Sequence, residues 1–347
     1  MPSFQLNHVL IHNRLLWRVE IKGVIMAVPW GIIIMAIILR SGLVRSSNVS
    51  NLVITLSYTL KMVGALLLQV IFTFYYTDRS VADIYRFFDD GLLLRQLLGD
   101  DPAAYLRIIS GFYPTDMFQA FFENFNAWNK PFDSGLYNDN HIMIKLNSVL
   151  SLISENLYEV NAVFFTASAY FACIALVRVF SFNNQKLGII LLVLFPGFLI
   201  WTSGGLKETL MITGLGIFMM PLIRDFNTDN KWIFYLIGAG ILAMVKIYVL
   251  FALLPAIAVL IASEKRQIKV LSANVIWTFI ISFCLVLSSL LQIDVIAQIV
   301  RKQHDFLAHS ALTNPGSLYT TTVLDNSWLS LAAAAPEALL SVCLRPS

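Results

Sequence analysis

Long apolar runs separated by short polar segments recur from Gly23 almost to the end of the sequence. A run of about 20 apolar residues can cross the hydrocarbon core of a bilayer as a helix. Helices are the elements expected there, because lipid offers the backbone no hydrogen-bond partners. The composition agrees, since 58% of the residues are hydrophobic and 13% are charged, against roughly 25% charged residues in soluble domains. The sequence therefore predicts an all-α, polytopic transmembrane helical bundle.

The apolar runs predict about nine membrane spans in a single integral membrane domain, residues 1–347. The expected spans are Gly23–Leu39, Leu52–Tyr76, Leu157–Phe180, Leu187–Trp201, Leu206–Ile223, Trp232–Val245, Ile247–Ala262, Ile268–Ile293 and Trp328–Leu344. Several of these runs are short for a full crossing. Tilted or half-embedded helices are therefore expected among them, and the count carries a margin of about one or two spans.

The positively charged residues between the runs predict the orientation of the spans. Lys and Arg gather in alternate short loops, at Arg178–Lys186, Arg224–Lys231 and Lys265–Lys269. Such loops are expected on the cytoplasmic side. The remaining loops then face outward. They include a large extracytoplasmic loop, residues 77–156, in which prolines predict short interfacial helices, and a second extracytoplasmic loop, residues 294–327.

Several functional classes find no support in the sequence. The net charge is +3 and no basic run is interleaved with aromatic residues, so nucleic acid is not an expected partner. The three cysteines lie in apolar runs without the spacing of metal ligands, and no metal site is assigned. A phosphate-binding loop, a zinc motif, a Ser-His-Asp set and a Cys-x-x-Cys pair are also missing from the sequence. An ATP-driven pump is therefore disfavoured, and a donor that carries its own leaving group is favoured.

The first candidate site is an acidic cluster at the start of the large loop. Asp83, Asp89 and Asp90 closely follow an apolar run, where carboxylates are costly unless they are solvated or functional. Asp83, Phe87 and Asp90 have the spacing i, i+4, i+7 and share one face of a helix. A carboxylate there can act as a general base on an acceptor hydroxyl, or hold a divalent cation, the one cofactor considered. The alternative is a solvated helix start, where the helix dipole favours Asp.

The second candidate site is the segment Trp201–Thr209, which reads WTSGGLKET. Two glycines predict a break in the helix where polar atoms first occur, and Lys207 and Glu208 begin the next helix. Backbone N–H groups at a helix start, beside a lysine, suit a phosphate group. We therefore assign substrate binding to Trp201, Ser203, Lys207 and Glu208. The alternative is a tight hairpin between spans that contains a locally neutralised Lys–Glu pair.

Two further residues are assigned to substrate binding. Lys246 stands in the apolar stretch ILAMVKIYVLF, and no other charged residue occurs between Lys231 and Glu264. A lysine so deep costs about 2.5–3.5 kcal/mol on insertion scales unless it snorkels or finds a partner. Snorkelling from a turn is the alternative, and it brings Lys246 to the same side as Asp83. His141 begins the helix-like run HIMIKLNSVLSLIS, where the alternative is a structural role.

Four stretches of the sequence resemble one class of membrane protein. They are the aromatic end FTFYY followed by Asp83-x-Tyr85-x-Phe87 and Gly91, then FPGFLIWTSGGLKETL (Phe195–Leu210), VKIYVL (Val245–Leu250) and PEALLSVCLRP (Pro336–Pro346). The second is the most specific. Together they resemble GT-C-type, polyprenyl-phosphate-sugar-dependent glycosyltransferase-like proteins of Bacteroidota-type bacteria.

The resemblance implies a multi-pass protein of the bacterial inner, or cytoplasmic, membrane. It implies an acidic catalytic residue near the start of the first outer loop, which Asp83 matches best, with Asp89 and Asp90 as second choices. Lys207 and Lys246 then hold the phosphate of a lipid-linked donor. Ile84 stands where the pattern has a second acid, and the pattern continues beyond Ser347, so a C-terminally truncated product is expected.

The leading functional hypothesis is transfer of a sugar from a polyprenyl-phosphate donor to an envelope glycan or lipid acceptor. The outer face of the membrane is the expected place, and membrane lipids are expected partners. A surface-polysaccharide polymerase that uses lipid-pyrophosphate donors is the alternative enzyme. A transporter or flippase of lipid-linked glycans, and a scaffold subunit of an envelope complex, are the non-enzymatic alternatives. Transport is disfavoured because the spans offer few polar groups and no inverted repeat.

Overall fold

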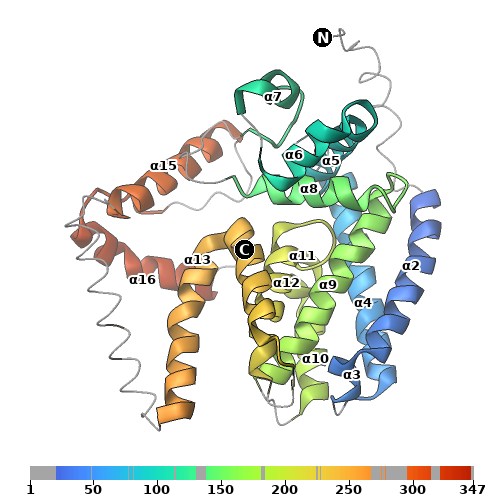
Figure 1. Ribbon diagram of the computed structural model, residues 1–347. Coiled ribbons are helices and arrows are strands. Elements are labelled where there is room, and N and C mark those ends of the chain that lie inside the picture. Colours follow the sequence, from blue (N-terminus) through green and yellow to red (C-terminus); the bar gives the residue numbers. More distant parts are fainter. Residues whose placement is uncertain are drawn as a thin grey trace. The chain divides into compact units, whose positions relative to one another are not determined.

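The computed structural model describes residues 21–47, 49–76, 78–80, 82–112, 115–129, 138–180, 184–223, 226, 228–266, 275, 278, 295–313 and 321–344. Every regular element in these ranges is a helix, as predicted (Figure 1). The chain divides into two compact units. One comprises Met1–Asn129 with Asp139–Leu250, and the other comprises Lys130–Asn138 with Phe251–Ser347.

Four helices in the described ranges are long and apolar enough to cross a membrane. They are α2 (Ile21–Arg40), α4 (Asn51–Val70) with its π-helical extension η1 (Ile71–Tyr75), α9 (Tyr158–Val179), and Lys231–Leu253 within α13 (Lys231–Arg266). The first three match predicted spans closely. The chain thus has the character of a membrane protein.

The predicted count of about nine spans is not supported. Two predicted spans are broken into shorter helices: α10 (Gln185–Leu194) with α11 (Pro196–Trp201), and α12 (Lys207–Met219) with the 3-10 turn η2 (Met220–Leu222). Proline occupies the first turn of both α11 and η2, because proline suits the first turn of a helix but not its interior. At 1.5 Å per residue, α12 is about 20 Å long and does not cross a hydrocarbon core of about 30 Å.

The remaining predicted spans also differ from the structure. Trp232–Val245 and Ile247–Ala262 lie in the continuous element α13, which consists of two helices joined at a kink at Lys246 (φ −150°, ψ 77°), the predicted boundary, while the candidate span Lys231–Leu253 runs across it. The predicted span Ile268–Ile293 lies outside the described residues except for positions 275 and 278. The last predicted span coincides with α16 (Trp328–Leu344), which has 17 residues and contains Pro336.

The segment predicted as the large outer loop forms four helices. They are α5 (Asp83–Asp100), α6 (Pro102–Ser110), α7 (Thr115–Phe122) and α8 (Asn140–Leu150). Asp101 separates the first two and caps α6, because its Oδ1 accepts a hydrogen bond of 2.9 Å from the Ala104 N–H. Figure 1 shows α5, α6 and α8 together at the end of the bundle where α9 begins.

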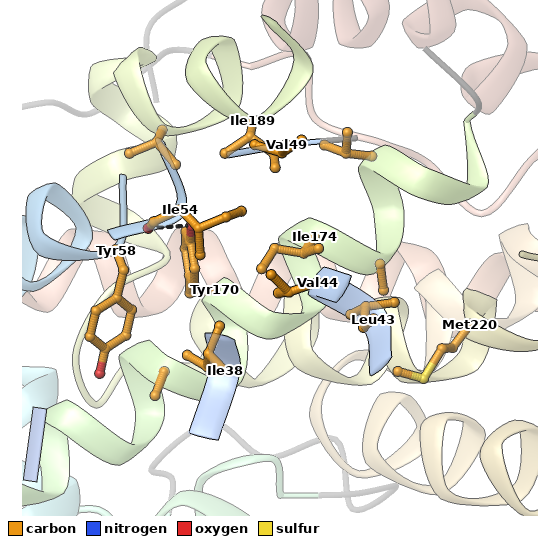
Figure 2. Packing of buried hydrophobic residues seen from close by; sticks show 14 of the residues in the cluster. Ile38, Leu43, Val44, Val49, Ile54, Tyr58, Tyr170, Ile174, Ile189 and Met220 are labelled. Carbon is orange, nitrogen blue, oxygen red and sulfur yellow. Dashed lines mark hydrogen bonds between the residues drawn. The ribbon is translucent and has the colours of Figure 1, made fainter. Parts of the chain in front are cut away.

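The core of the first unit lies between α4, α9 and α10, with the short helix α3 (Gly42–Arg45) against it. Tyr170 of α9 is fully buried there among Ile54, Tyr58 and Ile174 (Figure 2). Its hydroxyl donates a 2.8 Å hydrogen bond to the Ile54 carbonyl of α4. The Ser57 hydroxyl donates to the same carbonyl at 3.1 Å. α9 is buried on nearly all sides and forms the centre of the unit.

Two glycines allow the helices around the site to approach closely. A Cβ at Gly91 of α5 would lie 2.8 Å from the Asn147 Cβ and 2.9 Å from the Ser148 backbone nitrogen of α8. A Cβ at Gly216 of α12 would lie 2.4 Å from the Ala172 Cβ of α9. All three distances are too short for a real Cβ atom. The backbones of α5 and α8, and those of α12 and α9, therefore approach each other more closely than any residue with a side chain would allow.

A buried polar stripe runs along α4 and into η1. Its members are Ser57, Lys61, Gln69 and Thr73, spaced by multiples of four residues so that they form a stripe that winds slowly around the helix. Each bonds a group on another element: the Tyr170 hydroxyl, the Phe198 carbonyl and the Thr202 hydroxyl, the Glu159 carboxylate, and the Tyr85 hydroxyl, respectively. Such interhelical hydrogen bonds hold helices together in a membrane.

The second unit contains α15 (Val295–Thr313) and α16, with residues 321–327 leading into α16. Gln303 of α15 fixes this segment, because its side chain donates to the Thr322 carbonyl at 2.9 Å and accepts from the Leu324 N–H at 2.7 Å. Thr322 in turn donates to Glu337 of α16 at 2.6 Å. In the predicted second outer loop, residues 294–327, the part that forms α15 is helical.

Candidate functional site

Two lysines from different helices meet at one carboxylate. The ammonium of Lys207 lies 2.8 Å from Asp139 Oδ1, and the ammonium of Lys246 lies 3.8 Å from Asp139 Oδ2. The side chains of Lys207 and Asp139 are each 16% exposed and that of Lys246 is 26% exposed. The structure therefore brings together two predicted phosphate-binding residues that are far apart in the sequence.

Lys207 is positioned by the glycine turn between α11 and α12. Gly204 has φ +71°, which glycine adopts without strain. Its N–H donates a 2.8 Å hydrogen bond to the Thr166 hydroxyl, and the Gly205 N–H donates a 3.3 Å bond to the Tyr158 hydroxyl. Both acceptors belong to α9, so the central helix sets where α12 begins and where Lys207 stands.

Ser203, within the same turn, is fully buried, and its hydroxyl donates to the Leu199 carbonyl at 2.6 Å. Trp201 ends α11, is 37% exposed, and meets the Phe72 ring edge-on at 6.4 Å. Glu208 is half-buried in the first turn of α12. These three predicted site residues therefore surround the turn, while Lys207 is the predicted residue of this segment that forms an ion pair with Asp139.

Lys246 is positioned by the interruption of α13. A residue inside a continuous helix keeps helical dihedrals, whereas Lys246 adopts φ −150° and ψ 77°. The sequence predicted a break at this residue, and the structure has one. The ammonium lies 6.0 Å from the centre of the Tyr248 ring as well as near Asp139.

Asp139 was not among the predicted site residues. It immediately precedes α8 in the order Asp139-Asn140-His141, where an acidic residue is expected to cap the helix. Its side chain makes no capping hydrogen bond to α8 and engages the two lysines instead. The sequence contained one usable signal, an Asp two residues before the candidate residue His141.

The acidic cluster at the start of α5 separates into three environments. Asp89 forms a two-point ion pair with Arg79, whose Nε and Nη2 donate to its two oxygens at 2.8 and 2.7 Å. The Arg79 guanidinium also lies 4.0 Å from the centre of the Tyr85 ring. Asp83 is the first residue of α5; its side chain is 54% exposed and lies 3.7 Å from Arg86 Nη1. Of these two carboxylates, Asp83 is the more accessible.

Asp90 is the buried member of the cluster. It has no exposed surface, and its two oxygens accept hydrogen bonds from the Asn126 N–H at 2.8 Å and the Ala127 N–H at 2.7 Å. Burial raises the pKa of Asp90 to about 6, although the two backbone hydrogen bonds act in the opposite direction. In this environment Asp90 holds the turn that leads to Trp128.

His141 takes part in an aromatic stack. Its ring lies 4.0 Å from that of Trp128 at 20°, and Trp128 lies 4.1 Å from Phe122 at 7°. The Nε2 atom of His141 lies 2.9 Å from the Trp128 carbonyl. These contacts give His141 the structural role that was the alternative to substrate binding.

The face of α5 that carries Asp83 adjoins the lysine site. The Lys207 ammonium lies 5.4 Å from the centre of the Phe87 ring. Asp83 precedes Phe87 by one helical turn, a rise of about 6 Å along the helix. The predicted base and the predicted phosphate ligands therefore belong to neighbouring parts of the first unit.

Chemically, the site offers two ammonium groups, one carboxylate and the start of a helix. Ammonium groups and the N–H groups of a helix start both favour an anion such as a phosphate. Among the described residues, no group of three or more His, Cys, Asp or Glu side chains is arranged to hold a metal ion.

Comparison of the chain with known protein families, curated proteins and solved structures gives no match.

Proposed function

We propose that this protein is a membrane glycosyltransferase of the bacterial inner membrane. It moves a sugar from a polyprenyl-phosphate-linked donor to an envelope glycan or lipid acceptor at the outer face. The observation that carries the proposal is the convergence of Lys207 and Lys246 on Asp139. The four apolar helices support the membrane setting and are consistent with a lipid-linked substrate.

The two lysines are assigned to the phosphate of the donor. When the bond between the sugar and the phosphate breaks, negative charge develops on the leaving phosphate. Two ammonium groups that are already in place stabilise this charge without reorganisation, and they do so more strongly where water is scarce. The low exposure of the Lys207 side chain, 16%, meets that condition.

Asp83 is assigned as the general base. In an inverting transfer the acceptor oxygen attacks the face of the sugar opposite the leaving group. The base must lie about 3 Å from the acceptor oxygen, which itself lies about 3 Å from the anomeric carbon. A base in direct contact with the phosphate-binding lysines is therefore too close. Asp83 stands one turn of α5 before Phe87, whose ring Lys207 approaches, and its side chain is accessible.

The proposed reaction is a single displacement. The acceptor O–H loses its proton to the Asp83 carboxylate while its oxygen forms a bond to the anomeric carbon. The bond from that carbon to the phosphate oxygen breaks, and its electron pair leaves with the polyprenyl phosphate. The sugar configuration inverts, and the lysines hold the departing phosphate.

Transport of a lipid-linked glycan is the second candidate, and the buried polar stripe of α4 and η1 is the observation that favours it. Transport pathways need polar groups at membrane depth. Each member of this stripe, however, bonds a group on another element. Such contacts suit helix association better than a pathway.

The test uses the full chain in lipid nanodiscs with a polyprenyl-phosphate sugar and a lipid acceptor. Replacement of Lys207 by Met, or of Asp83 by Asn, is expected to lower transfer by on the order of 10²-fold, because each removes one assigned role. Exposed Asp229, in the turn before α13, provides the matched control Asp229→Asn, which is expected to retain activity. Unchanged transfer in both site variants would refute the proposal, and glycan movement without release of polyprenyl phosphate would favour transport.

A further inference from the structure

The Asp139 carboxylate lies between the lysines in the manner of a phosphate group. Its two oxygens face different ammonium groups, Oδ1 toward Lys207 and Oδ2 toward Lys246. A phosphate also presents separate oxygens to separate cations, and it can accept a charge-assisted hydrogen bond such as that of Lys207 as well as a longer ion pair such as that of Lys246. The carboxylate and a phosphate would therefore require the same donors.

Asp139 contacts the lysines and does not cap the helix that follows it, although an Asp immediately before a helix usually does so. It precedes the first residue of α8, with φ −70° and ψ −6°, and its side chain makes no capping hydrogen bond to that helix. Asp101, in the equivalent position before α6, does cap its helix through the Ala104 N–H at 2.9 Å. The backbone at Asp139 is helical, whereas that at Asp101 has the non-helical dihedrals of a capping residue (φ −146°, ψ 87°), so the Asp139 carboxylate is available to the lysines and does not cap its own helix.

We propose that Asp139 and the phosphate of a prenyl lipid compete for Lys207 and Lys246, an inference that rests on the function proposed above. When the phosphate binds, its oxygens replace the carboxylate oxygens at the two ammonium groups. When the phosphate departs, the carboxylate returns. Asp139 is thus an internal anion that sets the affinity of the site, and it is not the base.

The charges of donor and product give this competition a purpose. The donor is a phosphodiester with one negative charge, whereas the product is a monophosphate with a charge of about −1.5 to −2 at neutral pH. Two lysines without a competitor would bind the product more tightly than the donor, and the product would then inhibit the next turnover. A carboxylate that re-engages the lysines weakens both complexes and accelerates release of the product.

The expected size of the effect follows from the fraction of time in which the lysines are available. If Asp139 engages them about nine-tenths of the time, the apparent affinity for a phosphate falls about tenfold. Removal of the carboxylate restores that factor. The change concerns the phosphate group alone, so a neutral prenyl alcohol should bind equally well to both proteins.

The experiment measures binding of farnesyl phosphate, and of farnesol as its uncharged analogue, to the full chain in nanodiscs. Asp139→Asn is expected to lower the Kd for farnesyl phosphate about tenfold and to leave farnesol binding unchanged. Asp229→Asn removes the same charge from an exposed turn and is expected to change neither value. An unchanged or higher Kd for farnesyl phosphate in Asp139→Asn would overturn the competition.

Lysine variants separate this inference from the proposed function. If Lys207→Met and Lys246→Met do not weaken farnesyl phosphate binding, the anion site itself is refuted. If they weaken it while Asp139→Asn does not tighten it, only the competition is refuted. Asp139→Ser provides a second neutral variant with a good helix cap, should the Asn variant fold poorly, and the same tightening is required of it.

Discussion

At the scale of single residues, burial distinguishes carboxylates that look equivalent in the sequence. Asp89 and Asp90 are adjacent, yet one forms a two-point ion pair with Arg79 and the other holds two backbone N–H groups without any exposed surface. Asp83, seven residues before Asp90, remains accessible. Because Asp83 is accessible and Asp90 is buried, we expect substitution of Asp83 to affect catalysis and substitution of Asp90 to affect stability.

Asp90 is expected to make stability depend on pH between about 4 and 6. Its pKa is about 6 in the folded protein, above the ordinary value of 3.8, so the folded state holds a proton that the unfolded state releases. Stability is therefore greatest below about pH 4 with respect to this group and falls as the pH rises through about 6, by up to about 3 kcal/mol. Asp90→Asn cannot titrate and should lack this slope. Apparent melting temperatures of both proteins in detergent between about pH 4 and 8 provide the measurement, and parallel curves would contradict the assignment.

At the scale of helices, close contacts and chain breaks position the site. The apolar stretch that was predicted to form the spans Leu187–Trp201 and Leu206–Ile223 is interrupted at Pro196 and again at the Gly204–Gly205 turn. The break lets α12 begin at Lys207, against α9. The interruption of α13 at Lys246 has the same consequence for the second lysine. The two lysines of the site therefore stand at chain breaks: Lys207 at the start of α12 and Lys246 at the kink of α13.

The contact between α5 and α8 is expected to depend on Gly91. In Gly91→Ala the new methyl group would lie 2.9 Å from the Ser148 backbone nitrogen and 3.0 Å from the Ile144 carbonyl oxygen, and backbone atoms cannot yield as a flexible side chain does. We expect a loss of about 1–3 kcal/mol of stability. At Gly99 of the same helix, a new methyl group would meet no other element within 4 Å, so Gly99→Ala should be neutral or slightly stabilising. Thermal unfolding of the two variants provides the comparison, and equal melting temperatures would contradict the close contact.

At the scale of the first unit, the alternation of helices places the site at one end. Lys207 and Lys246 lie beside the start of α8, because Asp139, which precedes that helix, contacts both lysines. Arg40, Arg178 and Lys231 stand at the opposite ends of α2, α9 and α13. Which of these two ends faces the cytoplasm stays a prediction from the basic residues.

The orientation can be measured with single cysteines at the two ends. Ser80, between α4 and α5, and Asn230, before α13, are both exposed. Because basic residues favour the cytoplasmic side, Ser80→Cys should react with a membrane-impermeant maleimide in intact spheroplasts. Asn230→Cys should react only after permeabilisation. The reverse pattern would show that the site faces the cytoplasm and would exclude an outer-face transferase.

The helical class, the membrane character and two of the chain breaks, at Gly204–Gly205 and at Lys246, were predictable from the sequence alone. These features depend on local hydropathy and on the backbone limits of proline and glycine, so they can be predicted from neighbouring residues. The predicted count of about nine spans is not supported, because two of the predicted spans form short, broken helices. Lys207 and Lys246 were suspected for the same local reason, namely a charge in an apolar setting.

Only the tertiary structure decided which carboxylate the lysines meet. Asp139 is distant from both lysines in sequence, and its contact with them depends on how α8, α12 and α13 are arranged around α9. It also depends on the Asp139 side chain, which makes no capping hydrogen bond to its own helix. Long-range side-chain contacts follow from the shapes of packed helices, and local sequence patterns do not carry that information.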